Sequence, residues 1–324
     1  MYLVALLDKL GVGRYSPSMT RELKRRCVVL MMSLFPAIAS FVAVASAQDN
    51  AQKFACTKCA EWNVRQLPFR IYGNTYYVGP RGLSSILVSS PHGHVLIDGA
   101  LAESAPVIAD NIRALGFRLN DVKLILSTHV HYDHAGGIAE LQKQTGAKVA
   151  ASPWSAEVLS KSGIGNGDPQ FNIIRPIPLV SNVSVLMDGE SVSAGGTRLT
   201  AHFTPGHTPG GTTWTWRSCE GSRCITVVYA DSLAAISQDG FRFTDTSDHS
   251  HAIDDFKRSI AFLRKTDCDI LLTPHPEVSE LWDRLKRREE GAGWRALTNR
   301  NACRELAGHA EEQLHNRIES ERQR

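Results

Sequence analysis

Residues 129–134, with the sequence His-Val-His-Tyr-Asp-His, place three imidazoles and a carboxylate within six positions. Neighbouring residues of an extended segment point to opposite sides, so these four groups cannot all bind one tetrahedral ion. The spacing instead indicates two adjacent metal ions, one bound by His129 and His131 and the other by Asp133 and His134. Such a pair acidifies water and polarises a carbonyl group, which predicts a zinc-dependent hydrolase.

Each predicted ion needs a further ligand, and two histidines stand in rigid turns that suit this role. His207 lies in the segment Thr-Pro-Gly-His-Thr-Pro-Gly-Gly, residues 204–211, and His275 lies in Thr-Pro-His-Pro, residues 273–276. Both turns follow apolar, strand-like runs, and the prolines fix the backbone that presents the imidazole. His207 and His275 are therefore the candidates that complete the two sites.

Strand-like and helix-like segments alternate twice along the chain. The predicted strands are residues 69–78, 83–90, 94–98, 122–128, 147–152, 183–187, 197–203, 212–216, 224–229 and 269–273. Helices are predicted at residues 104–115, 138–144, 254–264 and 279–290, with an amphipathic helix at 302–322. This pattern predicts an α/β fold of four layers, αβ/βα, in which two mixed β-sheets pack face to face with helices on both outer faces. The Gly-, Asn- and Pro-rich segment 163–177 is expected to be a mobile loop beside the site.

The first 47 residues have the anatomy of a secretory signal peptide. A basic segment at residues 21–26 precedes an apolar stretch at 27–45, and Ala45-Ser46-Ala47 forms a small-x-small cleavage site. A membrane anchor is the alternative, but Pro36 and the cleavage site favour removal. Met19 begins a more ordinary signal sequence than Met1 does. We therefore expect residues 1–47 to be a signal peptide and 48–324 a periplasmic catalytic domain, with no membrane anchor after cleavage.

The charge balance of the remaining chain argues against a nucleic-acid partner. Residues 1–47 contain six of the 36 Lys and Arg and two of the 33 Asp and Glu, which leaves 30 basic and 31 acidic residues. A protein that follows a phosphate backbone needs a clustered basic surface. We expect no nucleic-acid binding, a small-molecule substrate and a monomer.

Six cysteines remain after residue 47, an even number that favours disulfides in an exported protein. Cys219 and Cys224 flank a turn-like insert between two strand-like runs, so we pair them. Cys56-x-x-Cys59 suits a redox or metal motif, but it lies in a polar extension outside any βαβ unit, which argues against both. Spacing leaves the other pairings open.

The order His-x-His-x-Asp-His, Gly-His-Thr-Pro-Gly, Ala-Asp-Ser and Pro-His resembles the metallo-β-lactamase superfamily, and four stretches look like its subclass B3. They are Trp62-Asn63, residues 71–79 (Ile-Tyr-Gly-Asn-Thr-Tyr-Tyr-Val-Gly), residues 206–214 (Gly-His-Thr-Pro-Gly-Gly-Thr-Thr-Trp) and residues 229–233 (Tyr-Ala-Asp-Ser-Leu). The resemblance extends over residues 56–305. It implies hydrolysis of the β-lactam amide of penicillins, cephalosporins and carbapenems by a dizinc-bound hydroxide, and resistance to these antibiotics.

The resemblance also implies residue roles. His129, His131 and His207 would bind the first of two Zn²⁺ ions, and Asp133, His134 and His275 the second. Asp133 would also position the nucleophile, Ser232 would bind the substrate carboxylate, and Cys268 and Cys303 would form a disulfide. Asp98, after the run 95–97, would orient a ligand histidine; an ordinary Asp-Gly turn is the alternative.

One position departs from the subclass pattern, and other zinc hydrolases remain as alternatives. A hydroxyl residue stands two positions after Ser232 in many members, but Ala234 stands here, which weakens the expected grip on a substrate carboxylate. A glyoxalase-like thioesterase or a lactonase would instead use Asp231 to bridge the metals. A nuclease would conflict with the charge balance, and a zinc-binding scaffold without activity would not need all six ligands.

Overall fold

A computed structural model describes residues 56–161, 167–245 and 251–323. The predicted signal peptide lies outside these residues, as does part of the loop predicted at 163–177. Among the residues described, no helix is both long enough and apolar enough to cross a membrane.

Two mixed sheets form the centre of the fold, as predicted. The first has seven strands in chain order, with β1 to β4 antiparallel and β4 to β7 parallel. These are β1 (Phe69–Tyr72), β2 (Thr75–Tyr77), β3 (Ile86–Val88), β4 (His94–Ile97), β5 (Val122–Leu126), β6 (Lys148–Ala151) and β7 (Val183–Val185). The second has the order β12-β11-β10-β9-β8, and β11 and β12 pair in parallel. Its strands are β8 (Ser191–Ser193), β9 (Arg198–Phe203), β10 (Thr212–Glu220), β11 (Arg223–Tyr229) and β12 (Ile270–Leu272).

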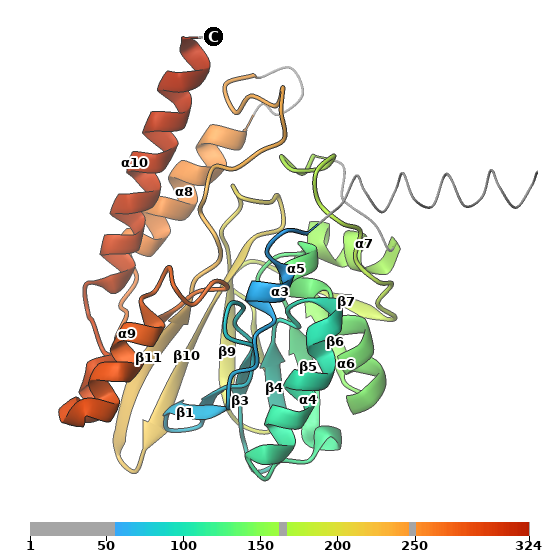
Figure 1. Ribbon diagram of the computed structural model, residues 1–324, viewed down its shortest axis with the longest axis vertical. Coiled ribbons are helices and arrows are strands. Elements are labelled where there is room, and N and C mark those ends of the chain that lie inside the picture. Colours follow the sequence, from blue (N-terminus) through green and yellow to red (C-terminus); the bar gives the residue numbers. More distant parts are fainter. Residues whose placement is uncertain (1–55, 162–166, 246–250, 324) are drawn as a thin grey trace, which may run out of the picture. The chain divides into compact units, whose positions relative to one another are not determined.

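Helices cover the outer face of each sheet (Figure 1). The first sheet is covered by α4 (Ala105–Ala114), α6 (Ile138–Thr145) and α7 (Pro153–Lys161). On the second, α8 (Ala252–Lys265) and α10 (Ala302–Arg322) lie side by side. Shorter helices are α3 (Cys59–Trp62), α5 (Tyr132–Ala135) and α9 (Leu281–Arg287), with single turns η1 (Ala102–Ser104), η2 (Leu119–Asp121), η3 (Arg288–Ala292) and η4 (Gly293–Leu297).

The alternation of side chains along the strands produces three apolar layers. Ile97 and Trp214 point between the two sheets, where they are fully buried. Leu96, next to Ile97, points the other way and packs under α4 with Ile108. Across the second sheet, Val228 packs against α8 and α10. Because adjacent strand residues face opposite sides, each sheet can pack against both its partner sheet and its helices.

The interpretation of residues 69–78 as one strand was wrong. The chain turns at Gly73, where φ is 52°, and returns as the antiparallel strand β2. A Cβ at Gly73 would lie 2.6 Å from the backbone oxygen of Cys219, so this turn needs both the left-handed backbone and the missing side chain of glycine.

The six described cysteines lie in three pairs with their sulfur atoms at disulfide distance: Cys56–Cys59, Cys219–Cys224 and Cys268–Cys303. Cys219 and Cys224 are directly opposite each other in the β10–β11 hairpin. Cys268 and Cys303 bring the segment before β12 to the first turn of α10.

Trp214 connects the core to the segment that carries the histidines. Its ring is fully buried between the sheets, and its indole N–H donates to the Ser127 carbonyl oxygen at 3.0 Å. Trp214→Phe should lower the free energy of unfolding by about 1–3 kcal/mol, because it leaves that buried carbonyl without a donor. Urea denaturation measures the change. The half-buried Trp294 provides the control, and equal losses for Trp214→Phe and Trp294→Phe would contradict this account.

Candidate metal centre

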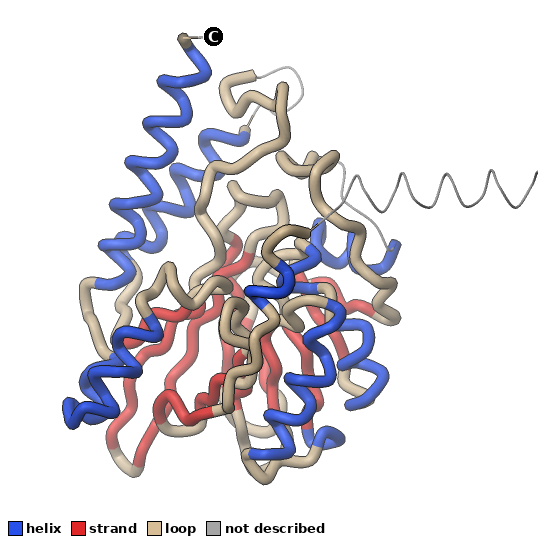
Figure 2. The backbone as a smooth tube through the Cα atoms, in the orientation of Figure 1, coloured by secondary structure: helices blue, strands red, loops and turns tan. Residues whose placement is uncertain are grey.

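The loops that carry the predicted ligands meet at one end of the two sheets. Residues 129–134 follow β5, His207 lies in the turn between β9 and β10, and His275 follows β12. In Figure 2 the loops at the upper ends of the strands form this region, beside α5 in Figure 1. The ends of strands from both sheets therefore contribute to one site.

The structure brings the six predicted ligands together as two groups of three. His129, His131 and His207 form the first triad, and Asp133, His134 and His275 form the second. Within each group, one potential ligand atom from each residue lies within 4.8 Å of the others. Five of the six residues are buried, and His275 is partly exposed. This grouping is the one implied by the family resemblance.

In the first triad, each ring has one nitrogen bound to a fixed acceptor. His129 Nδ1 lies 2.7 Å from Asp231 Oδ1, and His131 Nε2 lies 2.9 Å from Asp168 Oδ2. His207 Nδ1 donates to the carbonyl oxygen of Ala234 at 2.8 Å. A carbonyl only accepts, so Nε2 of His207 keeps its lone pair. Donation to the two carboxylates likewise leaves Nε2 of His129 and Nδ1 of His131 as ligand atoms.

The second triad has its carboxylate between two rings. Asp133 Oδ2 lies 3.2 Å from His134 Nε2 and 3.4 Å from His275 Nε2. Trp62 packs against His275, with the ring centroids 5.2 Å apart and the planes tilted by 53°. The partly exposed His275 therefore has one side covered by an aromatic ring.

Burial favours the neutral form of three ligand rings, those of His129, His134 and His207. It lowers the pKa of His129 well below 6.5, with the neighbouring rings of His134, His131 and His207 acting in the same direction. It lowers the pKa of His207 to about 3, with His131 contributing, and it lowers the pKa of His134. Burial disfavours the charge of Asp133, but the His134 and His275 rings outweigh it and hold the carboxyl pKa well below its usual range. Neutral imidazoles and an ionised carboxylate are the ligand forms that zinc binds.

One buried ligand nitrogen has no hydrogen-bond partner in the described structure, as expected of an atom that binds a metal ion. His129 Nε2 is buried and has no hydrogen-bond partner in the described structure, although the other nitrogen of its ring is bound to Asp231. A buried polar atom without a partner costs about 1–3 kcal/mol, and coordination of a cation removes that cost. Three nitrogens in one triad, and two nitrogens with an oxygen in the other, are the donor types of zinc sites.

The prediction that Asp98 orients a ligand histidine was wrong, because Asp98 binds Thr128 and Tyr229 instead. Its carboxylate accepts hydrogen bonds from the backbone and hydroxyl of Thr128, at 2.7 and 2.8 Å, and from the Tyr229 hydroxyl at 2.8 Å. Asp98 thus fixes the residue before His129, and none of these hydrogen bonds goes to a ligand ring. Burial raises the Asp98 pKa to about 7. The carboxylate that does contact His129 is Asp231.

Sequence reasoning missed Asp168, and it gave Asp231 a different role. Asp168 is buried and its second oxygen accepts from the Gln170 amide at 2.8 Å, so the described part of the 163–177 segment contacts the first triad directly. Asp231 Oδ2 is buried, and a Cβ on Gly211 would approach it to 2.4 Å. The only sequence signal for either residue was its place in a segment already predicted to lie near the site.

Ser232 shares a cleft with His275 of the second triad. The cleft has a volume of about 260 Å³, and Ala234 and the α10 residues Leu306 and Ala310 also line it. The side chain of Ala234 offers no hydroxyl to this cleft, although its carbonyl binds His207.

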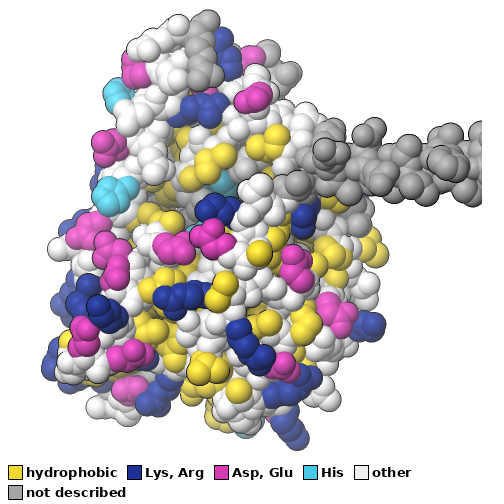
Figure 3. Space-filling model, in the orientation of Figure 1, with side chains coloured by type: hydrophobic (Ala, Val, Ile, Leu, Met, Phe, Trp, Pro, Cys, Tyr) yellow, Lys and Arg dark blue, Asp and Glu magenta, His cyan; other side chains and the backbone are white. Residues whose placement is uncertain are grey.

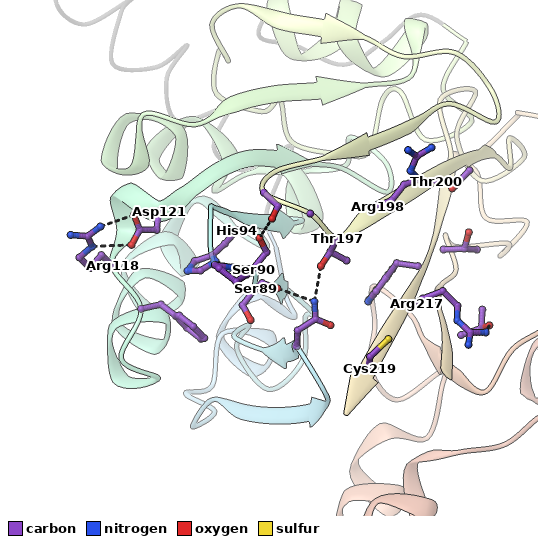
Figure 4. Close-up of a pocket in the computed structure, with 18 of the residues that line it drawn as sticks. Ser89, Ser90, His94, Arg118, Asp121, Thr197, Arg198, Thr200, Arg217 and Cys219 are labelled. Atoms are coloured by element: carbon purple, nitrogen blue, oxygen red, sulfur yellow. Dashed lines mark hydrogen bonds and ion pairs between the residues drawn. The ribbon is translucent and has the colours of Figure 1, made fainter. Parts of the chain in front are cut away.

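Figure 4 shows a larger groove, of about 1180 Å³. It lies at the opposite end of the sheets from the triads. Its residues come from the amino ends of β4 and β9 and the far end of β10. Arg118 pairs with Asp121 at 2.8 Å, and Arg217 donates to the Cys224 carbonyl oxygen at 2.9 Å. These arginines are satisfied within the protein, and neither histidine triad borders the groove.

Residues 78–262 match the model of the Metallo-beta-lactamase superfamily. The solved structure of the Rm3 metallo-beta-lactamase is 51% identical, covers 83% of this chain and 99% of its own, and has a TM-score of 0.80. MEM-A1, a subclass B3 metallo-beta-lactamase isolated from a soil metagenome library, is 48% identical over 80% of this chain and 98% of its own, with a TM-score of 0.78. The structure of SMB-1 bound to 2-mercaptoethanesulfonate is 46% identical over 80% of this chain and 99% of its own, with a TM-score of 0.77.

This chain is a subclass B3 member of the metallo-beta-lactamase superfamily. Membership places it among hydrolases with a metal-binding histidine site.

Other members of the superfamily match over shorter stretches. An N-acyl homoserine lactonase, AttM, from Agrobacterium fabrum is 29% identical over 146 residues, which are 38% of this chain and 55% of the lactonase. A hydroxyacylglutathione hydrolase from Maricaulis maris is 36% identical over 86 residues, or 26% of each chain. This chain therefore spans about half the length of the curated lactonase, whereas the alignments to the subclass B3 structures span nearly all of theirs.

The buried rings predict how the stability of the metal-free protein depends on pH. His207 has a folded-state pKa of about 3, against 6.5 ordinarily, because burial disfavours its charge. Between pH 7 and 5 the unfolded chain therefore binds a proton there that the folded chain does not. Stability should fall as pH falls, by about 2 kcal/mol for His207 alone. Urea unfolding of chelator-treated protein at pH 7, 6 and 5 tests this. His207→Gln should show a shallower slope; a flat profile for the unmutated protein would contradict the prediction.

Proposed function

We propose that this protein is a β-lactamase that uses two zinc ions to hydrolyse the amide bond of penicillins, cephalosporins and carbapenems, and so gives resistance to them. One observation carries the proposal: six metal-ligand side chains form two adjacent triads in a chain 46–51% identical to subclass B3 metallo-beta-lactamases over at least 80% of its length. When bound, the two ions would supply an acidified water and a Lewis acid for the amide carbonyl.

The chain's own residues would organise the reaction. The ionised Asp133 carboxylate accepts a hydrogen bond from the attacking water and orients it towards the carbonyl carbon. The Ser232 hydroxyl, which lines the same cleft as His275, donates to the substrate carboxylate. Trp62 covers one side of His275 and excludes solvent from that side. Without a hydroxyl at Ala234, the substrate carboxylate has one donor fewer, so we expect weaker binding of substrates that depend on it.

The contact of Asp231 argues against the lactonase and thioesterase alternatives. In those enzymes an aspartate at this position would bridge the two metals. Here Asp231 Oδ1 lies 2.7 Å from His129 Nδ1, on the side of the ring away from the ligand nitrogen. Its role in this chain is therefore to orient His129.

We also propose export to the periplasm and oxidation of all three cysteine pairs. The predicted signal peptide and the three pairs of adjacent sulfur atoms support this. On the face shown in Figure 3, charges of both signs are interspersed, in agreement with a protein that binds no nucleic acid. Cell fractionation and titration of free thiols test the two proposals.

The first test is the hydrolysis of a carbapenem and a chromogenic cephalosporin, with and without a zinc chelator. We expect turnover of both, loss of turnover with chelator and recovery on adding zinc, with zinc content measured in parallel. Zinc-loaded protein that cleaves a thioester or an acyl lactone faster than either β-lactam would overturn the proposal.

Asp133 is the residue whose replacement should affect chemistry most. Asp133→Ala should lower kcat by about 10²–10⁴-fold, because it removes the group that orients the attacking water. Steady-state kinetics at saturating zinc separate this from simple loss of metal. Asp110→Asn, at an exposed position of α4, is the matched control and should leave kcat unchanged. A near-normal kcat for Asp133→Ala would contradict the role of Asp133 in orienting the attacking water.

A further inference from the structure

The C-terminal part of α10 contacts the loop that follows β11 through two charged residues. Arg317 and Glu321, one helical turn apart, form an ion pair with Arg317 Nε 2.5 Å from Glu321 Oε1. The Glu321 side chain is 6% exposed and that of Arg317 25% exposed, so the pair is largely removed from water. We call these two residues the α10 clamp.

The α10 clamp binds the loop at several points. Arg317 donates to the Ala235 and Phe241 carbonyl oxygens at 3.4 and 2.9 Å and to the Ser237 hydroxyl at 2.7 Å, and its guanidinium lies 5.0 Å from the centre of the Phe243 ring. Glu321 accepts from the backbone amides of Phe243 and Thr244 at 3.1 and 2.9 Å. Burial disfavours the charge on Glu321, but these amides and Arg317 outweigh it and lower its pKa. An ionised, buried pair that uses its other hydrogen bonds on one loop fixes the conformation of that loop.

The clamped loop in turn positions His207. Ala234, directly before the first contact of Arg317, has the carbonyl oxygen that accepts from His207 Nδ1 at 2.8 Å. This bond selects the ring tautomer and directs Nε2 towards the other histidines of the first triad. The α10 clamp therefore holds the acceptor of a ligand histidine without contacting the ring.

The same loop also reaches the second acceptor of the first triad. The backbone amide of Gln238 donates to the Pro169 carbonyl oxygen at 2.9 Å, and its side-chain oxygen accepts from the Asn172 amide at 2.7 Å. Pro169 follows Asp168, whose carboxylate lies 2.9 Å from His131 Nε2. Two of the three acceptors that orient the first triad are thus connected to α10.

We infer that Arg317 and Glu321 are positioning residues for the first histidine triad, acting through the loop 234–241 and through Gln238. This inference rests on the proposed zinc site and is independent of which substrate the enzyme hydrolyses. Without the clamp, the acceptors of His207 and His131 are free to move. Zinc binding must then order them, which lowers zinc affinity.

The experiment measures zinc affinity of the full chain by competition with a chromophoric chelator. Arg317→Ala should lower the affinity by about tenfold, the lower end of the range for residues that support metal ligands. It should also change the cobalt absorption spectrum of the cobalt-substituted protein. Arg317→Lys should recover part of the affinity. Arg322→Ala is the control on the same helix. It removes an exposed ion pair with Glu319 and should change zinc affinity by about twofold or less.

A second variant keeps the inference testable if Arg317→Ala does not fold. Gln238→Ala, at a half-buried position, removes only the link to Asn172 and should lower zinc affinity by a smaller factor. The double variant Arg317→Ala/Gln238→Ala should lose less than the product of the single effects, because both act through one loop. Unchanged zinc affinity and cobalt spectra in folded variants, with only Tm reduced, would overturn the inference. Protein that shows the affinity changes but cleaves no β-lactam would refute the proposed function alone.

Discussion

Each histidine of the first triad is oriented by one hydrogen bond from the ring nitrogen that faces away from the other histidines. The acceptors are two carboxylates, Asp231 and Asp168, and the carbonyl oxygen of Ala234. Their positions determine which nitrogen of each ring is free to bind metal. A carbonyl can only accept, and a carboxylate accepts from a neutral ring, so the tautomer of each histidine follows from the acceptor beside it. The loops at this end of the fold must therefore have fixed conformations before a metal ion can bind well.

The rest of the fold provides this rigidity. Asp98 binds Thr128 and Tyr229 at the junction of the two sheets, and Trp214 binds the carbonyl of Ser127. Asp98 and Ala100 both have positive φ, of 63° and 52°, which costs about 1–3 kcal/mol at each residue. The chain tolerates this strain because the turn brings the Gly99 amide within 2.7 Å of the His134 carbonyl oxygen. The strained backbone at residues 98–100 and these buried hydrogen bonds together fix the position of the ligand segment 129–134.

The ligands could be predicted from the sequence because their signal is local. Histidines at alternate positions after an apolar run, and single histidines between prolines, need no knowledge of the fold to be recognised. Strand alternation likewise predicts the layers. The acceptors carry no such signal: Asp168 is 37 residues from His131, and Asp231 is 102 residues from His129. Asp98 was given the role of Asp231 because both follow strands whose ends meet at the site, and only the packing of the two sheets decides between them. The turn at Gly73 was missed because the residues on either side of it continue the strand pattern.

The separation between His129 and Asp231 has a consequence for the order of events in folding. We expect contacts between residues so far apart in the chain to form late, since the loop between them must close before the contact stabilises anything. The first triad is thus complete only after the two sheets have packed. A metal ion captured at that stage would act as a cross-link between finished sheets, slowing unfolding while leaving the rate of folding almost unchanged. Protein depleted of zinc should then reach the same fold at the same speed, but lose it sooner.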